Sequence, residues 1–126
     1  MDRRVEIVLT LIQNDIRKNP TVSQLARLVH LSPSRFEHIF RTETNVSLVQ
    51  YVKSLKLRKA RDLLETTFLN VKEIMAIVGV NDLSHFVRDF KKVFGVTPSE
   101  YRKSKPIGEH PLVSKQPGRP TNGRFR

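Results

Sequence analysis

The chain states one sequence pattern twice, about 50 residues apart. Three aromatic pairs, Phe36/Phe86, Phe40/Phe90 and Tyr51/Tyr101, recur at an offset of 50. Three apolar pairs upstream recur instead at an offset of 49, and these are Leu25/Ile74, Leu28/Ile77 and Val29/Val78. An insertion of one residue is tolerated in a turn and not inside a helix, so a turn is expected between residues 29 and 36. The pattern predicts an all-α fold with two copies of a helix-turn-helix.

Helix starts are marked by capping boxes, in which a Ser, Thr or Asn cap is followed three residues later by Glu or Gln. Four such pairs occur in register with the repeat: Thr21 with Gln24, Ser47 with Gln50, Asn70 with Glu73, and Thr97 with Glu100. Proline stands at the first helical position after Ser32 and Thr97, where it has no hydrogen bond to lose. Ser32 thus marks a fifth helix start, and Asn81 or Asp82 marks a sixth. These signals predict two repeated sets of helix starts.

Seven helices follow from these starts and from apolar periodicity. Their expected ranges are Arg3–Arg17, Val22–Val29, Pro33–Thr42, Leu48–Leu64, Val71–Val78, Asp82–Phe94 and Pro98–Lys103. One domain, 1–104, would hold a first helix-turn-helix at about 21–46, a linker helix at about 47–65 and a second helix-turn-helix at about 70–95. The Pro- and Gly-rich residues 105–126 predict a flexible basic tail.

The composition excludes several kinds of site and favours an anionic partner. The absence of Cys excludes disulfides, thiolate zinc sites and cysteine nucleophiles. The four His show no close metal spacing, the five Gly are scattered, and no nucleophile stands with a base, so neither an enzyme nor a cofactor is expected. No stretch of about 18 apolar residues occurs. The net charge of +11, of which +6 lies in residues 102–126, favours nucleic acid.

The length of the linker helix suggests why the unit is doubled. A helix of 19 residues is about 28 Å long. With its flanking turns it would hold two recognition helices about 34 Å apart, which is one turn of B-DNA. One monomer would then read two successive major-groove segments, although a helix-turn-helix also serves to pack three helices without DNA.

Residues 5–103 resemble the DNA-binding domain of the AraC/XylS family of bacterial transcription regulators. The resemblance is carried by LARLVHLSPSRFEHIFRTETNVSLVQYV, by LKLRKARDLL and, most specifically, by VGVNDLSHFVRDFKKVFGVTPSEYRK. It implies seven helices, two helix-turn-helix subdomains and sequence-specific promoter binding in the bacterial cytoplasm, on the nucleoid. The expected partner is double-stranded DNA, bound by a monomer, with RNA polymerase as a further candidate. The sequence departs from the family pattern at His38, Asn45, Met75 and Val80.

The recognition helices expose the candidate base-reading residues. In the third helix Phe36, Ile39 and Phe40 are expected to face inward; Ser34, Glu37 and His38 match the family's base-reading positions, and Arg35 also points outward. In the sixth helix the matching residues are Leu83, Ser84, His85 and Arg88. Arginine can bind guanine through two hydrogen bonds, and glutamate can accept from cytosine N4. The alternatives are a Glu37–Arg41 pair, packing of Leu83 on Val80, and an ion pair of Arg88 near Asp89 or with Asp82.

Phosphate contacts are expected at helix starts, where free N–H groups favour anions, and at basic side chains. The candidates are Thr21, Arg41, Ser47, Lys53, Lys56, Asn70, Lys91, Lys92, Thr97 and Arg102. Neutralising about eight phosphates would give a slope near −7 for log affinity against log salt.

Three alternatives stay open at this stage. Pro117–Pro120, PGRP, resembles an AT-hook, but nonspecific attraction by the tail is favoured over it. The chain as a whole could be a sequence-indifferent DNA-compacting protein, or an interaction module for the transcription machinery. It could be a stand-alone regulator or one piece of a longer chain, and Met1 and the tail favour the first.

Overall fold

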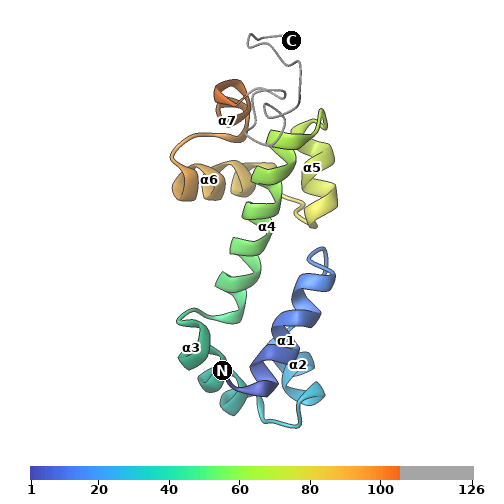
Figure 1. Cartoon of the computed structure of the whole chain (residues 1–126), viewed down its shortest axis with the longest axis vertical. Coiled ribbons are helices and arrows are strands. Elements are labelled where there is room, and N and C mark those ends of the chain that lie inside the picture. Colours follow the sequence, from blue (N-terminus) through green and yellow to red (C-terminus); the bar gives the residue numbers. More distant parts are fainter. Residues whose placement is uncertain (106–126) are drawn as a thin grey trace, which may run out of the picture. The chain divides into compact units, whose positions relative to one another are not determined.

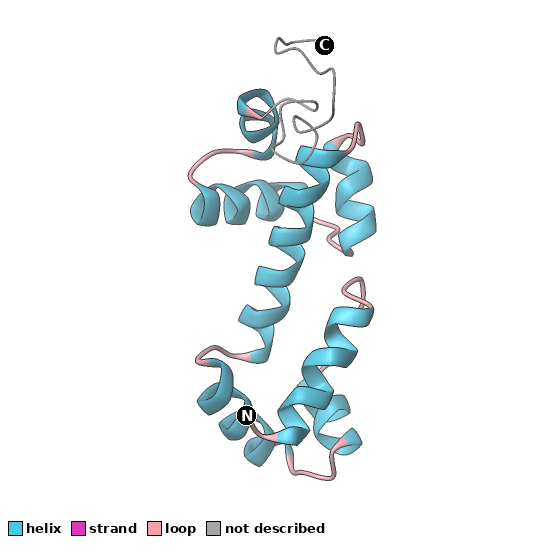
Figure 2. Cartoon of the chain, viewed as in Figure 1, coloured by secondary structure: helices cyan, strands magenta, loops and turns pink. Residues whose placement is uncertain are grey.

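The computed structural model describes residues 1–105, and in this part of the chain all regular structure is α-helical (Figures 1 and 2). The elements are α1 (Arg3–Asn14), α2 (Val22–Leu28), α3 (Pro33–Thr44), α4 (Leu48–Thr66), α5 (Val71–Val78), α6 (Leu83–Phe94) and α7 (Pro98–Ser104). The seven expected helices are therefore confirmed. The tail expected at 105–126, with its PGRP stretch, lies outside the described residues except for Lys105.

Three helix ends differ from the expectation by two residues or more, and three others differ by one residue. α1 stops at Asn14 instead of Arg17, because Asp15 leaves the helical region at φ −148° and ψ 83°. The half-buried Ile16 therefore follows the helix. α3 runs two residues further than expected, to Thr44, where Asn45 ends it with a φ of 67°. α4 likewise continues to Thr66.

The chain divides into two units, residues 1–56 and residues 57 onward, and each has its own core. In the first unit α1, α2, α3 and the start of α4 enclose ten buried residues: Val5, Val8, Ile12, Leu25, Ala26, Val29, Phe36, Phe40, Leu48 and Val52. In the second unit the buried residues are Leu57, Ala60, Leu64, Ile74, Met75, Val78, Phe86, Phe90 and Pro98. The paired phenylalanines of the repeat occupy both cores.

The structure extends the repeat to a helix that the sequence analysis did not pair. The buried residues Val5, Val8 and Ile12 of α1 correspond to Leu57, Ala60 and Leu64 in the second half of α4, each 52 positions later. α4 thus closes the first unit with its first half and opens the second with its other half. Each unit is a leading helix, a helix-turn-helix and a closing helix.

The closing helices are held by one tyrosine contact, which is repeated in both units. Gln13 Nε2 donates to the hydroxyl of Tyr51 at 3.0 Å, and the hydroxyl of Tyr101 donates to Glu65 Oε2. Gln13 and Glu65 are also 52 positions apart. Burial, and then the hydrogen bond to Glu65, raise the pKa of Tyr101 to about 12. The hydroxyl therefore keeps its proton at neutral pH and remains a donor.

All four predicted capping boxes form, with both hydrogen bonds present in each. The helix ends are less symmetric. Four of the residues that the structure describes have a left-handed φ, and the second unit uses Gly79 and Gly95 where the first uses His30 and Asn45. Asn and His are among the non-glycine residues that adopt this region most often, although both are more strained there than Gly. The positive φ of His30 could not be predicted from the sequence.

Gly95→Ala should lower the free energy of unfolding by about 1 kcal/mol, because alanine is strained at a φ of +86°. The smaller conformational entropy of alanine in the unfolded chain offsets part of this strain. A Cβ at this position meets no atom within 4 Å, so the loss would contain no contribution from a steric clash. Urea unfolding checks it. His30→Gly is a reverse change at another residue with a left-handed φ, and it should be stabilising. An unchanged stability of Gly95→Ala would contradict the strain argument.

Candidate nucleic-acid interface

Helix α3 buries one side and exposes the other. Phe36 and Phe40 are each 1% exposed, and their rings lie 5.7 Å apart. The four predicted base-reading residues of this helix, Ser34, Arg35, Glu37 and His38, are all exposed. The helix begins after Ser32, whose hydroxyl accepts from the Arg35 N–H at 3.2 Å. The cap, the proline at N1 and the buried rings fix which side of the helix faces outward.

Helix α6 is built in the same way. Phe86 and Phe90 are buried, whereas Leu83, Ser84, His85 and Arg88 are exposed. Leu83 is 45% exposed, which leaves much of its side chain available beyond any packing at the turn. Both predicted base-reading sets therefore lie on the outward faces of their helices. That placement is a condition for reading bases, and the contacts themselves stay a prediction.

A carboxylate stands at the start of α6. Asp82 accepts from the His85 N–H at 2.9 Å, and its other oxygen lies 2.9 Å from His85 Nδ1. These two bonds, the backbone bond first, hold the pKa of Asp82 below its usual value. The pair fixes the imidazole at the N-terminal end of the recognition helix. His85 is thus held in position by its own helix cap.

The helix starts of the two units differ in the charge of the residue that completes the capping box. In the first unit the boxes of Thr21 and Ser47 are completed by the neutral Gln24 and Gln50. In the second unit Glu73 and Glu100 complete those of Asn70 and Thr97. A carboxylate at a helix start already satisfies the positive end of the helix and repels phosphate. The starts at Thr21 and Ser47 are therefore the better candidates for phosphate contact.

The predicted basic contacts separate into exposed and buried side chains. Arg41, Lys53, Lys91 and Lys92 are exposed. Lys56 is only 5% exposed, its Nζ donates to Asn19 Oδ1 at 2.7 Å, and burial lowers its pKa. Arg102 is half-buried and donates to four backbone carbonyls, those of Leu63, Leu64, Thr67 and Leu69.

Lys56 and Arg102 therefore do not fit the phosphate role expected of them. Lys56 ties α4 to the loop after α1, and Arg102 ties α7 to the last turn of α4 and to the residues that follow it. Neither is kept among the proposed phosphate contacts. Their sequence neighbours gave no signal of this, because the partners lie more than 30 residues away.

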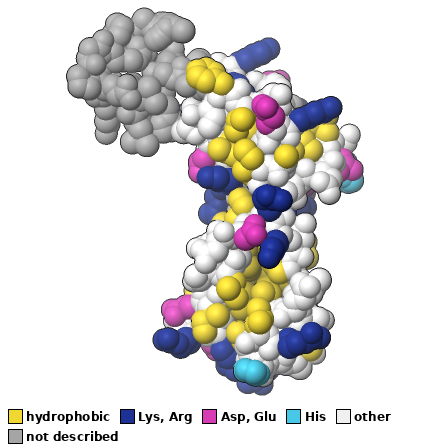
Figure 3. Space-filling view, turned by 90° about the vertical axis from the view of Figure 1, so that its right-hand side faces the viewer, with side chains coloured by type: hydrophobic (Ala, Val, Ile, Leu, Met, Phe, Trp, Pro, Cys, Tyr) yellow, Lys and Arg dark blue, Asp and Glu magenta, His cyan; other side chains and the backbone are white. Residues whose placement is uncertain are grey.

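The surface is not basic everywhere. Figure 3 shows a face on which hydrophobic side chains gather over the first unit, with Lys and Arg side chains around them. Large apolar side chains exposed in this unit include Ile7, Leu11 and Leu28. A phosphate backbone needs donors and positive charge, so apolar regions of this kind are poor candidates for DNA contact.

Among the described residues, no helix is both long and apolar enough to cross a lipid bilayer.

Comparison with known proteins identifies the family. Residues 25–104 match the model of a helix-turn-helix domain. The chain is 34% identical over 103 residues to the arabinose operon regulatory protein of Escherichia coli, covering 81% of this chain and 35% of that protein. It is 36% identical over 91 residues to the xylose operon regulatory protein of Escherichia coli, covering 72% of this chain and 23% of that protein.

The solved structures agree. The C-terminal domain of AraT, a response regulator from Geobacillus stearothermophilus, superimposes with a TM-score of 0.78 at 27% identity, covering 86% of this chain and 91% of that one. The chain spans about a third or less of the two operon regulators. The helix-turn-helix match and the shared seven-helix fold show that the chain belongs to the AraC/XylS family.

Proposed function

We propose that this chain is a sequence-specific double-stranded DNA-binding transcription regulator. The observation that supports this most directly is the pair of helices α3 and α6. Each helix buries two phenylalanines and exposes its four predicted base-reading side chains in its N-terminal half. The net charge of +11 supplies the electrostatic attraction to DNA. The two operon regulators that the chain resembles are bacterial, and this chain would act on the bacterial nucleoid in the cytoplasm.

The proposed binding mode uses one monomer and two grooves. α4 has 19 residues and belongs to both units. Its length of about 28 Å suits recognition helices placed about one helical turn of DNA apart. Specificity would come from α3 and α6, and the helix starts at Thr21 and Ser47 would anchor the first unit on phosphates. A promoter site would then contain two short sequence blocks.

Selection of random duplex DNA by the chain at about 150 mM salt, followed by sequencing, tests this proposal. We expect two enriched blocks with centres about 10.5 base pairs apart. A variant with α3 altered at Glu37 and His38 should lose one block, and a variant altered at Ser84 and Arg88 should lose the other. Binding without enrichment, which vanishes as salt rises, would instead show a charge-driven DNA-compacting protein.

A second candidate function is binding to a protein of the transcription machinery, such as RNA polymerase. The exposed apolar side chains Ile7, Leu11 and Leu28 favour it, because exposed apolar surface marks protein contacts. The absence of DNA binding at physiological salt, together with retention on RNA polymerase, would favour this function over the first.

A further inference from the structure

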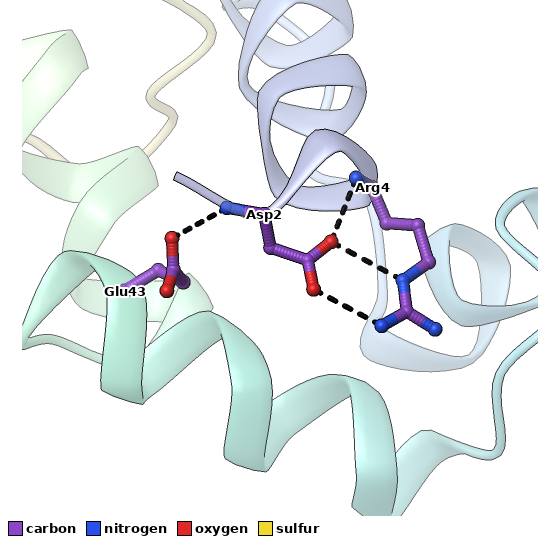
Figure 4. Close-up of polar contacts among 3 residues, drawn as sticks. All are labelled: Asp2, Arg4 and Glu43. Atoms are coloured by element: carbon purple, nitrogen blue, oxygen red, sulfur yellow. Dashed lines mark hydrogen bonds and ion pairs between the residues drawn. The ribbon is translucent and has the colours of Figure 1, made fainter.

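The start of α1 lies against the recognition helix of the first unit. The backbone N–H of Asp2 donates to Glu43 Oε1 at 2.7 Å, and Glu43 is near the C-terminal end of α3. Asp2 is also the N-cap of α1, with Oδ1 accepting from the Arg4 N–H at 2.8 Å. The first residues of the chain are therefore fixed to α3 by one bond and to α1 by another (Figure 4).

Asp2 in turn fixes the side chain of Arg4. Arg4 Nε lies 3.2 Å from Asp2 Oδ1, and Arg4 Nη2 lies 3.0 Å from Asp2 Oδ2. The fork of the guanidinium is matched by the carboxylate, which is the favoured geometry for arginine. Figure 4 shows Glu43 and Arg4 on opposite sides of Asp2. The guanidinium is thus held in one orientation, away from the Glu43 carboxylate.

Arg4 shares a pocket with two predicted base-reading residues. An open pocket of about 370 Å³ is lined by Asp2, Arg4, Arg35, His38, Ile39, Thr42 and Glu43. Arg35 and His38 belong to the exposed face of α3. Of the two carboxylates in the lining, Asp2 is matched by Arg4 and Glu43 accepts from the Asp2 backbone. Arg4, bonded to Asp2, therefore lines the same pocket as two residues of the recognition face.

We infer that Arg4 is a phosphate-binding residue of the first unit, contacting the DNA strand that borders the segment read by α3, with Asp2 as its positioning residue. This rests on the proposed function. The side chain of Arg4 is 43% exposed, and the pair with Asp2 uses two of its five N–H donors. The remaining donors can meet a phosphate oxygen while Asp2 keeps the guanidinium in place.

Within residues 1–105 the repeat places no equivalent exposed cation at the corresponding position, which makes the contact specific to the first unit. The position 52 residues after Arg4 is Lys56, and it is buried within α4. The reason is that α1 begins at Arg3 whereas the matching half of α4 is continuous helix. Arg4 could not be identified from the sequence, because the role of Arg4 depends on where the start of α1 packs.

The test compares Arg4→Ala with Arg17→Ala on the DNA selected by the intact chain. Arg17 is an exposed arginine just after the other end of α1, so both variants lose one positive charge from the same unit. Arg4→Ala should reduce affinity about three- to tenfold at 150 mM salt and make the salt slope shallower by about 0.9. Arg17→Ala should leave the slope within error, and Arg4→Lys should restore it in large part.

A duplex with one neutral methylphosphonate at the phosphate flanking the α3 block identifies the contact. The intact chain should lose affinity on this duplex, whereas Arg4→Ala should lose little more. Circular dichroism and the melting temperature would show whether Arg4→Ala keeps its fold. Equal slopes for Arg4→Ala and Arg17→Ala would overturn the inference while leaving sequence-specific binding intact. Loss of sequence preference in the unaltered chain would overturn the proposed function instead.

Discussion

Phe90→Ala should lower the free energy of unfolding of the second unit by about 3–5 kcal/mol. Phe90 is fully buried, and three aromatic rings surround it: Phe94 at 4.6 Å, Tyr101 at 5.8 Å and Phe86 at 6.0 Å between centroids. Removing the ring leaves a cavity that links α6 to α7. A unit of about 50 residues has only a few kcal/mol of stability, so we expect it to be unfolded at 25 °C.

The matched control is Phe68→Ala. Phe68 is 87% exposed, and its replacement should change stability by less than about 0.5 kcal/mol. Two-dimensional NMR of Phe90→Ala should show the resonances of the first unit retained and those of the second collapsed. Phe40→Ala, at the corresponding position of the first unit, should give the reverse pattern. A cost below about 1.5 kcal/mol for Phe90→Ala would contradict the packing described for this core.

Arg88→Ala is expected to lower affinity for the selected DNA by about 5- to 150-fold, corresponding to about 1–3 kcal/mol for one bidentate arginine–guanine pair. Arg88 is exposed on the outward face of α6, two residues before the buried Phe90. Repeating the selection with the variant should show relaxed preference at one base position, while the remaining positions keep theirs. Arg88→Lys should restore little, because lysine cannot form the planar pair of hydrogen bonds.

Lys92→Ala serves as the comparison for Arg88→Ala. It removes the same charge one helical turn further along α6, from an exposed side chain predicted to meet phosphate. It should weaken binding to all sequences alike and make the salt slope shallower by about 1. If Arg88→Ala behaves like Lys92→Ala, with all sequences weakened equally, Arg88 does not read a base.

The features that could be predicted from the sequence are those set by neighbours along the chain. The four capping boxes join residues three positions apart, and all of them form. The inward phenylalanines of α3 and α6 followed from helical spacing, and this spacing also placed the exposed residues of both helices correctly. The positive φ of Asn45 is one that Asn tolerates, so this departure from the family pattern leaves the turn intact.

The features that could not be predicted depend on distant partners. Lys56 and Arg102 look like surface cations in sequence, but one bonds to Asn19 and the other to carbonyls at the end of α4. Arg4 stands in a run of charged residues and gains its position only from Asp2 and α3. The early end of α1 was missed because the apolar period continues to Ile16 although Asp15 interrupts the backbone.

The double use of α4 makes this architecture open-ended. α7 stands where the first half of α4 stands in the preceding unit, and it has 7 residues where α4 has 19. Lengthening α7 by a copy of the second half of α4 would supply the leading helix of another unit. Such a chain grows by nearest-neighbour addition, as solenoid proteins do. The number of units in one polypeptide chain would then set the length of its binding site in base pairs, and a longer site would not require a dimer.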